Sequence, residues 1–448
     1  SGAARGSEPP AGGGGAPAGA APDALVAWKV GAVACAAYFL VYFTRFPVFM
    51  LPGSLTSATV GSLLGVDLPL KDALSFAFVL GFGLAKFPAV QVMSSELYMQ
   101  NRFATLCALN VAAGVLGTLP LALTGSPGAC VAGVFLAAFP ASWVFGGLAT
   151  YLEGRRATEV LFAALTSTFI FAGSASRGTA QAVLDAGVDP LWMPAAIAAV
   201  ALPATVGLLR VLDTLPGPSA EDRAARGARG ASTPAQSWAF AQRFLPGLLA
   251  FVVAYTGLVT IRQFRDLFAR DLLGAAFGGA VPDATTIFFL DAAGGAVAFA
   301  VLLAVSRIAS NKEAMLTMLR GALTFTLLTV VVGQAFAGGL IGGLAWQVLT
   351  GAFLFGAVAC MQGAFFDRLV AVSGEAITCT FLIFVADLIG YVGQFSLFAW
   401  KLLGSSGPAT PEAVLQQFHA ATAGLGLLAA LSLAACAWYF GERIPDGR

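Results

Sequence analysis

The sequence predicts an all-α integral membrane protein with twelve transmembrane helices in two pseudo-symmetric six-helix bundles. The chain of 448 residues is 58% hydrophobic and only 10% charged, and its mean hydropathy is +0.83. A soluble globular protein carries about 25% charged residues. Apolar runs of roughly 20 residues recur along most of the chain, and each is long enough to cross ~30 Å of hydrocarbon as a helix. The second half of the chain also repeats features of the first.

Twelve apolar runs mark the expected helices in chain order. Six precede and six follow a polar stretch that is rich in proline and glycine, LPGPSAEDRAARGARGASTPAQ. The expected helices span residues 25–50, 71–94, 101–123, 128–152, 156–184, 190–212, 238–266, 283–307, 311–337, 340–368, 374–402 and 411–440.

The domain organisation follows from these runs. The start of the chain is rich in Gly, Ala and Pro, a composition typical of disordered segments. It does not resemble a cleaved signal peptide, because the apolar run that follows is long enough for a full span. We expect a disordered N-terminal tail at 1–24, an N-terminal six-helix bundle at 25–212, a cytoplasmic linker at 213–237, a C-terminal six-helix bundle at 238–441 and a C-terminal tail at 442–448.

The positions of lysine and arginine predict the orientation of the helices. If the N-terminus is inside, the inner loops and tails hold thirteen of the 24 Lys and Arg residues, and the outer loops hold four. Short loops with many cations stay on the cytoplasmic side of a membrane. Both termini are therefore expected in the cytoplasm, with the protein in a plasma or an organelle membrane.

Two similar phrases open the two halves, AYFLVYFTRF at 37 and AYTGLVTIRQF at 254. Tyr38 precedes Arg45 by the same seven residues that separate Tyr255 from Arg262, and the two arginines are 217 residues apart. The phrase NRFATLCAL at 101 likewise matches NKEAMLTML at 311. Each helix of the first half then corresponds to the helix six places later. Parallel repeats of this kind bind solute near the midplane, between the halves.

Four cations lie inside predicted helices at depths from which they could reach one central cavity: Arg45, Lys86, Arg177 and Arg262. An ionised side chain at the bilayer centre costs ~2.5–3.5 kcal/mol, so such residues usually face a cavity or a partner. Two carboxylates in helix interiors, Asp291 and Asp387, leave an excess of about two positive charges. The excess predicts an anionic substrate. The two symmetry-related arginines could grip a phosphate or carboxylate with a bidentate geometry that lysine cannot supply.

These side chains also have simpler explanations. Arg45 and Arg262 could cap helix ends near the outer interface and reach water, and two prolines shortly after Arg45 favour an early helix end. Tyr38 and Tyr255 lie two helical turns below the arginines. They could line the floor of the cavity or pack in the core.

Further charged residues have two possible roles each. Asp387 could couple transport to protons, because desolvation favours the protonated carboxyl, or it could balance a nearby cation. The same alternatives hold for Asp291. Arg265 and Asp266, in the amphipathic stretch QFRDLFARDLL, could form an outer-gate ion pair or part of a solvated helix face.

A charge cluster at the predicted cytoplasmic ends of the helices repeats in the two halves: Glu153, Arg155 and Glu159 in the first, and Asp367, Arg368 and Glu375 in the second. These residues are too near the cytoplasm to touch a solute at the midplane. We expect them to form a cytoplasmic gate whose ion pairs hold an outward-open state. The alternative is a set of solvated loop ends.

Longer phrases resemble an uncharacterised family of major-facilitator-like membrane proteins, known only as a family of unknown function. They are VLGFGLAKF at 79, TYLEGRRATE at 150, IRQFRDLFARDL at 261 and FFDRLVAVSGEAITCTFLIFVADLIGYVG at 365. The resemblance runs from the first to the twelfth helix. It implies the major facilitator fold and a functional monomer, and it implies no particular substrate.

A looser resemblance links the chain to the organophosphate:phosphate antiporters of the same superfamily. Those proteins carry one arginine late in helix 1, another late in helix 7 and a Ser-Lys-Phe phrase in helix 2. Arg45, Arg262 and Lys86, the last in an Ala-Lys-Phe phrase, fall at matching places. The chain lacks their helix-5 histidine, for which Arg177 is the nearest candidate. The phrase SSELYMQNRF replaces the superfamily signature Gly-x-x-x-Asp-Arg-x-Gly-Arg in loop 2–3.

These features predict a secondary active transporter that moves a small organic anion, phosphorylated or not, by alternating access with exchange or proton coupling. Its expected partners are the lipid bilayer and a small anionic solute, and a net charge of +1 gives no reason to expect nucleic acid. The single histidine, His419, the lack of a P-loop pattern and the lack of a nucleophile–base set predict no metal, no cofactor and no enzyme activity. The alternative is a transporter-fold solute sensor or scaffold that does not transport.

Overall fold

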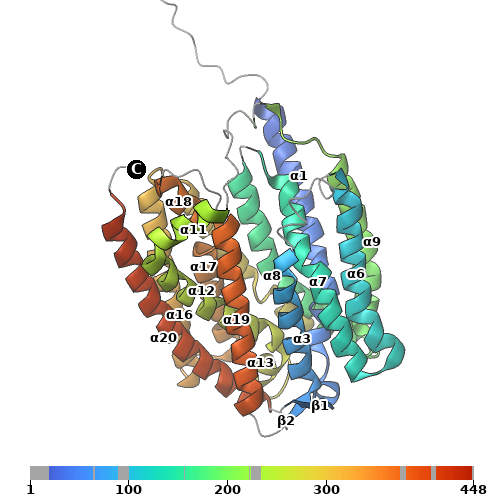
Figure 1. Ribbon diagram of the computed structural model, residues 1–448. Helices are drawn as coiled ribbons and strands as arrows, with labels where there is room; N and C mark the ends of the chain where they lie inside the picture. Colours follow the sequence, from blue (N-terminus) through green and yellow to red (C-terminus); the bar gives the residue numbers. More distant parts are fainter. Residues whose placement is uncertain are drawn as a thin grey trace, which may run out of the picture.

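The structure is a computed structural model that describes residues 20–63, 66–88, 100–155, 157–220, 222, 234–373, 380–404 and 410–445. Figure 1 shows long helices in two groups that lie side by side. The group from the first half of the chain is called the N bundle, and the other the C bundle. Helix α1 begins and helix α20 ends at one end of the molecule, called the terminal end. A two-stranded hairpin lies at the opposite end, called the hairpin end.

The N bundle holds the elements up to the central linker. Its helix α6 packs on α7 and α9, α1 packs on α8 and α9, and α3 packs on α7. The elements are α1 (Ala20–Val41), the 3-10 turns η1 (Tyr42–Thr44) and η2 (Pro47–Met50), α2 (Gly53–Thr56), β1 (Thr59–Leu63), β2 (Val66–Pro69), α3 (Leu70–Leu84), α6 (Arg102–Thr124), α7 (Pro127–Leu152), α8 (Thr158–Asp185) and α9 (Met193–Thr214).

The C bundle holds the elements after the linker. Its helix α12 packs on α19 and α20, α16 packs on α17 and α20, and α15 packs on α17. The elements are α11 (Pro234–Arg243), α12 (Leu245–Leu267), α13 (Ala269–Ala276), α14 (Ala284–Phe289), α15 (Ala292–Ser306), α16 (Asn311–Ala337), α17 (Gly343–Cys360), α18 (Gly363–Ser373), α19 (Thr380–Gly404) and α20 (Pro411–Arg443).

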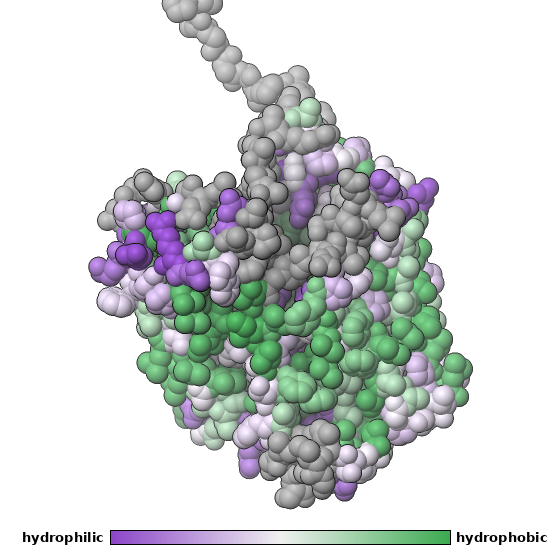
Figure 2. Space-filling view, viewed as in Figure 1, coloured by the Kyte–Doolittle hydropathy of each residue, from purple (hydrophilic) through white to green (hydrophobic). Residues whose placement is uncertain are grey.

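The predicted all-helical membrane fold is confirmed. Each of the twelve predicted ranges holds a helix or a series of helices in the described part of the chain. Ten helical segments among the described residues are long and apolar enough to cross a membrane, and α3 and α19, which fall outside that set, pack against each other across the bundles. On the face seen in Figure 2, apolar residues form a belt across the middle of the molecule, and hydrophilic residues gather toward its two ends. The chain is an integral, multi-pass membrane protein.

Several predicted helices are interrupted, which the apolar runs did not reveal. The first ends at Val41 and continues as η1 and η2, where Pro47 has no backbone N–H to extend a helix. The runs 238–266, 283–307 and 340–368 each divide into two helices. The hairpin of β1 and β2, with Thr59 opposite Pro69, also lies outside the predictions because its strands of five and four residues are too short for a clear pattern. The exact domain boundaries given above stay predictions.

The break between α14 and α15 is stabilised by a side chain of the N bundle. It falls at Leu290 and Asp291. The hydroxyl of Ser174 on α8 lies 3.1 Å from the carbonyl oxygen of Phe288 and accepts the backbone N–H of Asp291 at 3.2 Å. The hydroxyl thus satisfies backbone groups that have no hydrogen-bond partner within the interrupted helix. In apolar surroundings such groups need a partner.

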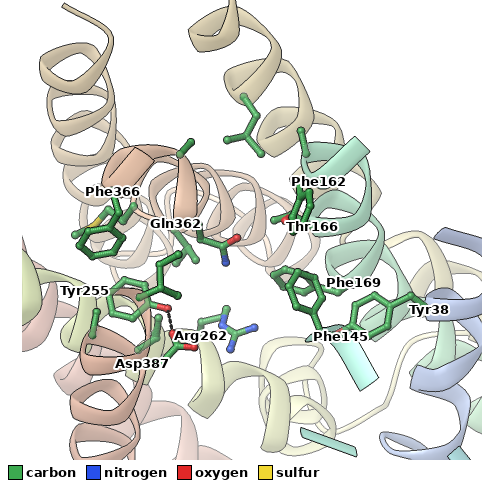
Figure 3. Close-up of a pocket in the computed structure, with 18 of the residues that line it drawn as sticks. Tyr38, Phe145, Phe162, Thr166, Phe169, Tyr255, Arg262, Gln362, Phe366 and Asp387 are labelled. Atoms are coloured by element: carbon green, nitrogen blue, oxygen red, sulfur yellow. Dashed lines mark hydrogen bonds between the residues drawn. The ribbon is translucent and has the colours of Figure 1, made fainter. Parts of the chain in front are cut away.

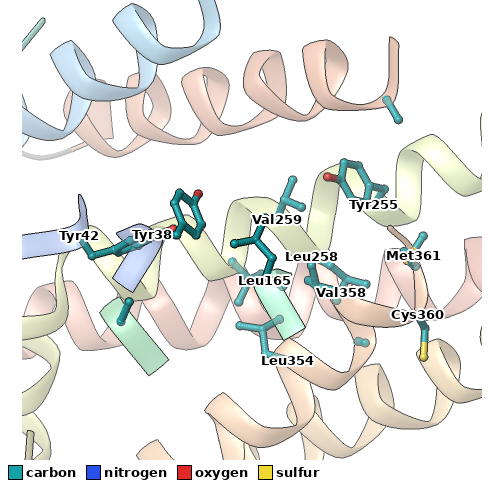
Figure 4. Packing of buried hydrophobic residues seen from close by; sticks show 14 of the residues in the cluster. Tyr38, Tyr42, Leu165, Tyr255, Leu258, Val259, Leu354, Val358, Cys360 and Met361 are labelled. Atoms are coloured by element: carbon teal, nitrogen blue, oxygen red, sulfur yellow. The ribbon is translucent and has the colours of Figure 1, made fainter. Parts of the chain in front are cut away.

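The two bundles meet along α8, which packs on α14 and α15, and along α3, which packs on α19. Buried side chains from both bundles form one continuous cluster. Figure 4 shows part of it, in which Leu165 of α8 lies among side chains of α12 and α17 that include Leu258 and Leu354. Gly178 allows the close approach of α8 to α14, because a Cβ there would lie 2.5 Å from the Phe288 nitrogen and 2.6 Å from the Ala284 carbonyl oxygen.

We expect Gly178→Ala to lower the free energy of unfolding by roughly 1–3 kcal/mol, because the new methyl group meets backbone that cannot rotate away. The measurement is the thermal unfolding temperature of the purified protein in detergent. Gly207→Ala is the matched control, since a Cβ at Gly207 in α9 meets nothing within 4 Å and alanine favours a helix. Equal unfolding temperatures for the two variants would contradict the close contact at Gly178.

Candidate functional site

A cavity of about 850 Å³ lies between the two bundles. Its lining includes Glu153, Asp367 and Arg368 at the terminal end, so it extends from the middle of the molecule to that end. Four of the seven tyrosines of the chain line it: Tyr38, Tyr42, Tyr255 and Tyr391. In Figure 3, Tyr38, Phe145, Phe162 and Phe169 of the N bundle face Tyr255, Phe366 and Asp387 of the C bundle across the cavity.

Arg45 and Arg262, the repeated arginines, both line this cavity. Arg45 lies between η1 and η2, and its Nη2 donates to the Ala141 carbonyl oxygen at 2.6 Å. Arg262 lies five residues before the end of α12, and its Nη2 lies 3.4 Å from Oε1 of Gln263. Among the described residues, neither guanidinium has a carboxylate within 4.0 Å, and the buried Nε atom of each has no hydrogen-bond partner.

Aromatic rings, rather than carboxylates, surround the two guanidinium groups. The Arg45 guanidinium carbon lies 5.5 Å from the centre of the Tyr42 ring and 5.9 Å from that of Phe82. The Arg262 guanidinium carbon lies 5.7 Å from the centre of the Phe169 ring, which belongs to the other bundle. Such cation–π contacts attract a guanidinium group but do not neutralise its charge.

Tyr42 lies beside Arg45, whose guanidinium carbon is 5.5 Å from the centre of the Tyr42 ring, and Tyr42 and Tyr391 line the same cavity as the two arginines. The two arginines border this cavity from the two bundles. The part of the cavity lined by Tyr42, Tyr391 and the two arginines is called the arginine floor.

Asp387 joins the two bundles beside the arginine floor. Its Oδ1 accepts a hydrogen bond from the Tyr255 hydroxyl at 2.7 Å, drawn as a dashed line in Figure 3. Its Oδ2 lies 3.9 Å from Nζ of Lys86, which follows α3 in the N bundle. Tyr255 and Lys86 both line the cavity, and Asp387 lies within ion-pair distance of Lys86. Contact of these residues with a solute stays a prediction. The coupling role of Asp387 stays a prediction.

Arg177 lies elsewhere than expected. It is 1% exposed, it does not line the cavity, and it pairs with two carboxylates of the C bundle. Its Nη2 lies 2.8 Å from Oδ2 of Asp291, and its Nη1 lies 3.3 Å from Oδ1 of Asp266. The depth of Arg177 along α8 follows from the sequence. The direction of its side chain depends on the carboxylates that lie beside it, one on α12 and one at the break between α14 and α15.

Arg265 completes this buried group, and it forms an ion pair with Asp291 rather than the expected pair with Asp266. Its Nη2 lies 2.7 Å from Oδ1 of Asp291 and donates to the Gln347 carbonyl oxygen at 3.0 Å. A Cβ at Gly351 of α17 would lie 2.9 Å from Oδ1 of Asp291, so glycine makes room for the group. Arg177, Arg265, Asp266 and Asp291 are called the buried quartet.

The quartet changes where the excess charge lies. It holds two cations and two carboxylates, so it is neutral as a group if all four are ionised. At the arginine floor and beside it lie three cations, Arg45, Lys86 and Arg262, and one carboxylate, Asp387, which is an excess of two positive charges. Arg368, Glu153 and Asp367 line the cavity at the terminal end, so the described lining as a whole has an excess of one. The predicted excess is therefore retained with a different set of residues, and all of it borders the cavity.

Further ion pairs join the bundles at the hairpin end. Lys401 of α19 pairs with Asp72 of α3 at 2.6 Å, and Lys71 of α3 pairs with Asp271 of α13 at 3.4 Å. Arg270 of α13 donates to Gln181 of α8 at 3.0 Å. None of these side chains lines the cavity. In the sequence, Lys71, Arg270 and Lys401 fall in the predicted outer loops, and their partners cannot be read from it because the pairing needs both bundles in place.

Of the residues predicted to form a cytoplasmic gate, Glu153, Asp367 and Arg368 line the cavity at the terminal end. Arg155 donates to the Pro216 carbonyl oxygen at 2.5 Å, and Arg368 donates to Oδ1 of Asn311 at 2.8 Å within the C bundle. Glu375 and the side chain of Glu159 lie outside the described residues. The gating ion pairs stay a prediction.

Comparisons with known proteins agree on the fold. A family model described as "Family of unknown function (DUF5690)" matches residues 54–443. No curated protein sequence matches the chain. The solved structure of a bacterial homologue of the human lysosomal transporter Spinster, inward-facing and unoccupied, is similar with a TM-score of 0.56 at 12% identity, over 97% of this chain and 100% of that chain.

The nucleoside transporter NupG is similar with a TM-score of 0.57 at 11% identity, over 92% of this chain and 98% of that chain. Identities this low indicate a common fold and no more. That fold is the major facilitator fold, with one bundle from each half of the chain.

Proposed function

We propose that this chain, which belongs to the DUF5690 family of unknown function and has the major facilitator fold, is a secondary transporter that moves a small organic anion by alternating access. The observation that carries this proposal is the arginine floor. Arg45 and Arg262 border one cavity from opposite bundles, and neither has a carboxylate partner among the described residues. A positive cavity of this kind favours an anion, which both bundles can hold at once.

The state of the cavity fits alternating access. The cavity extends to the terminal end, while ion pairs between the bundles lie at the hairpin end. With both termini in the cytoplasm, as the loop charges favour, this is an inward-open arrangement. Opening the hairpin end would require those ion pairs and the contacts of the quartet between bundles to separate. The anion, exchanged for another anion or moved with protons through Asp387, would offset part of that cost.

A solute sensor or scaffold with the same fold is the alternative. The two similar structures are both of transporters or their homologues, which favours transport for this chain.

A counterflow assay separates transport from sensing. Proteoliposomes holding the purified chain are preloaded with inorganic phosphate, a sugar phosphate, a monocarboxylate, a dicarboxylate or a neutral sugar, and uptake of the same labelled compound is followed. We expect uptake of one or more anions above the level in empty liposomes, and no uptake of the neutral sugar. An anion that binds the protein and is not taken up would support the sensor, and uptake of the neutral sugar alone would contradict an anion transporter.

A further inference from the structure

The walls of the cavity differ in chemistry from its floor. Phe145 of α7 and Phe162 and Phe169 of α8 border the cavity on the N-bundle side, and each is only partly buried. Tyr255 of α12 and Phe366 of α18 lie opposite, on the C-bundle side (Figure 3). The positive charge lies at the floor, so the cavity offers an anion site at its base and aromatic surfaces beside it.

Polar groups also lie beside these rings. Figure 3 labels Thr166 and Gln362 there, together with Tyr38 and with Tyr255, whose hydroxyl already donates to Asp387. A ligand with many hydroxyl groups would lose hydrogen bonds to water when it packs against the phenylalanine rings. Each hydroxyl group left without a hydrogen-bond partner in the protein would cost binding free energy. An apolar ring gains from the same surfaces through its buried area and through offset or edge contacts with other rings.

The size of the cavity also argues against an inorganic ion alone. A volume of about 850 Å³ lies within the range of roughly 300–1,000 Å³ that is typical of sites for drug-sized molecules. A bare phosphate held at the arginine floor would leave the aromatic walls uncovered.

We infer that the transported anion has an aromatic or similarly flat apolar body, held between the phenylalanine walls while its carboxylate or other anionic group meets Arg45 and Arg262. This inference rests on the proposed function and specifies the substrate class of the same site. Thr166 and Gln362 then orient the body, and the rings of both bundles close on it when the cavity narrows.

The test uses two monocarboxylates that differ in the body and share the anionic group. The dissociation constants of 2-naphthoate and gluconate are measured by titration calorimetry with the full chain in detergent. We expect 2-naphthoate to bind at least about tenfold more tightly, because its rings bury apolar area that gluconate lacks. Phe162→Ala should weaken naphthoate binding about fivefold or more and leave gluconate unchanged, since it removes a wall ring and keeps the arginine floor.

Phe289→Ala is the matched control, because Phe289 of α14 is 58% exposed and does not line the cavity. It should leave both dissociation constants unchanged. The inference would be overturned if gluconate bound as tightly as 2-naphthoate, or if Phe162→Ala and Phe289→Ala weakened naphthoate binding equally. In either case, weaker anion binding to Arg262→Gln than to the wild type would still support the proposed function. If none of 2-naphthoate, gluconate and inorganic phosphate binds, both fail.

Discussion

Replacing Asp291 with alanine is expected to lower the free energy of unfolding by about 3–5 kcal/mol, because it leaves buried cations without their partner. Asp291 is 0% exposed and receives Arg177 at 2.8 Å and Arg265 at 2.7 Å. Without it, Arg265 has no carboxylate within 4.0 Å among the described residues, and Arg177 retains only the 3.3 Å contact with Asp266. The measurement is thermal unfolding of the purified protein in detergent.

Asp283→Ala is the control for that prediction. Asp283 precedes α14 on the same segment and is exposed, and its side chain accepts hydrogen bonds from the backbone N–H and the hydroxyl of nearby Thr286. Its loss should lower the unfolding temperature far less. If Asp291→Ala does not yield folded protein, Asp291→Asn, which keeps the shape of the side chain, takes its place. An unfolding temperature of either Asp291 variant equal to that of Asp283→Ala would mean that the quartet contributes little to stability.

Arg45→Gln and Arg262→Gln are each expected to weaken anion binding about ten- to a hundredfold. Glutamine can still donate hydrogen bonds, so the loss reports the charge of the guanidinium, and hydrogen bonds to charged groups contribute about 1.5–3 kcal/mol each. The dissociation constant is measured by equilibrium titration of the variant in detergent. Arg210→Gln is the control, because the Arg210 side chain is 66% exposed on α9, pairs with neighbouring Asp213 and does not line the cavity.

An anion that binds equally well to Arg45→Gln, Arg262→Gln and Arg210→Gln would place it away from the arginine floor. A loss in only one of the two floor variants would place the anion on one bundle. In that case only one of the two repeated arginines would contact the substrate.

The sequence predicted the helices and the position of Arg45 and Arg262 at one cavity for one physical reason. In a helix that rises ~1.5 Å per residue, the depth of a residue in the membrane follows from its place in the apolar run. The apolar runs and the repeat therefore give the helices and the depth of the two arginines. Arg45 and Arg262 border the same cavity, as their equal spacing from Tyr38 and Tyr255 predicts. Lys86 reaches it for the same reason.

The sequence could not give the direction of a side chain around its helix or the interruption of a helix. Arg177 was expected in the cavity and lies in the buried quartet, because Asp291 turns toward it at a break that Ser174 of the other bundle stabilises. The pair of Lys401 and Asp72 joins residues that are 329 positions apart. Contacts between bundles of this kind depend on tertiary packing, which leaves no local pattern in the chain.

The most direct test of the central claim is a thermal-shift comparison of the wild-type chain and the Arg45→Gln/Arg262→Gln double variant. The panel holds inorganic phosphate, a sugar phosphate, 2-naphthoate, a dicarboxylate and a neutral sugar. A ligand at 100 times its dissociation constant stabilises a protein by ~2.7 kcal/mol, which a thermal shift detects. We expect one or more anions to stabilise the wild type and not the double variant. Equal stabilisation of both proteins, or a response to the neutral sugar alone, would contradict an anion held between the two arginines.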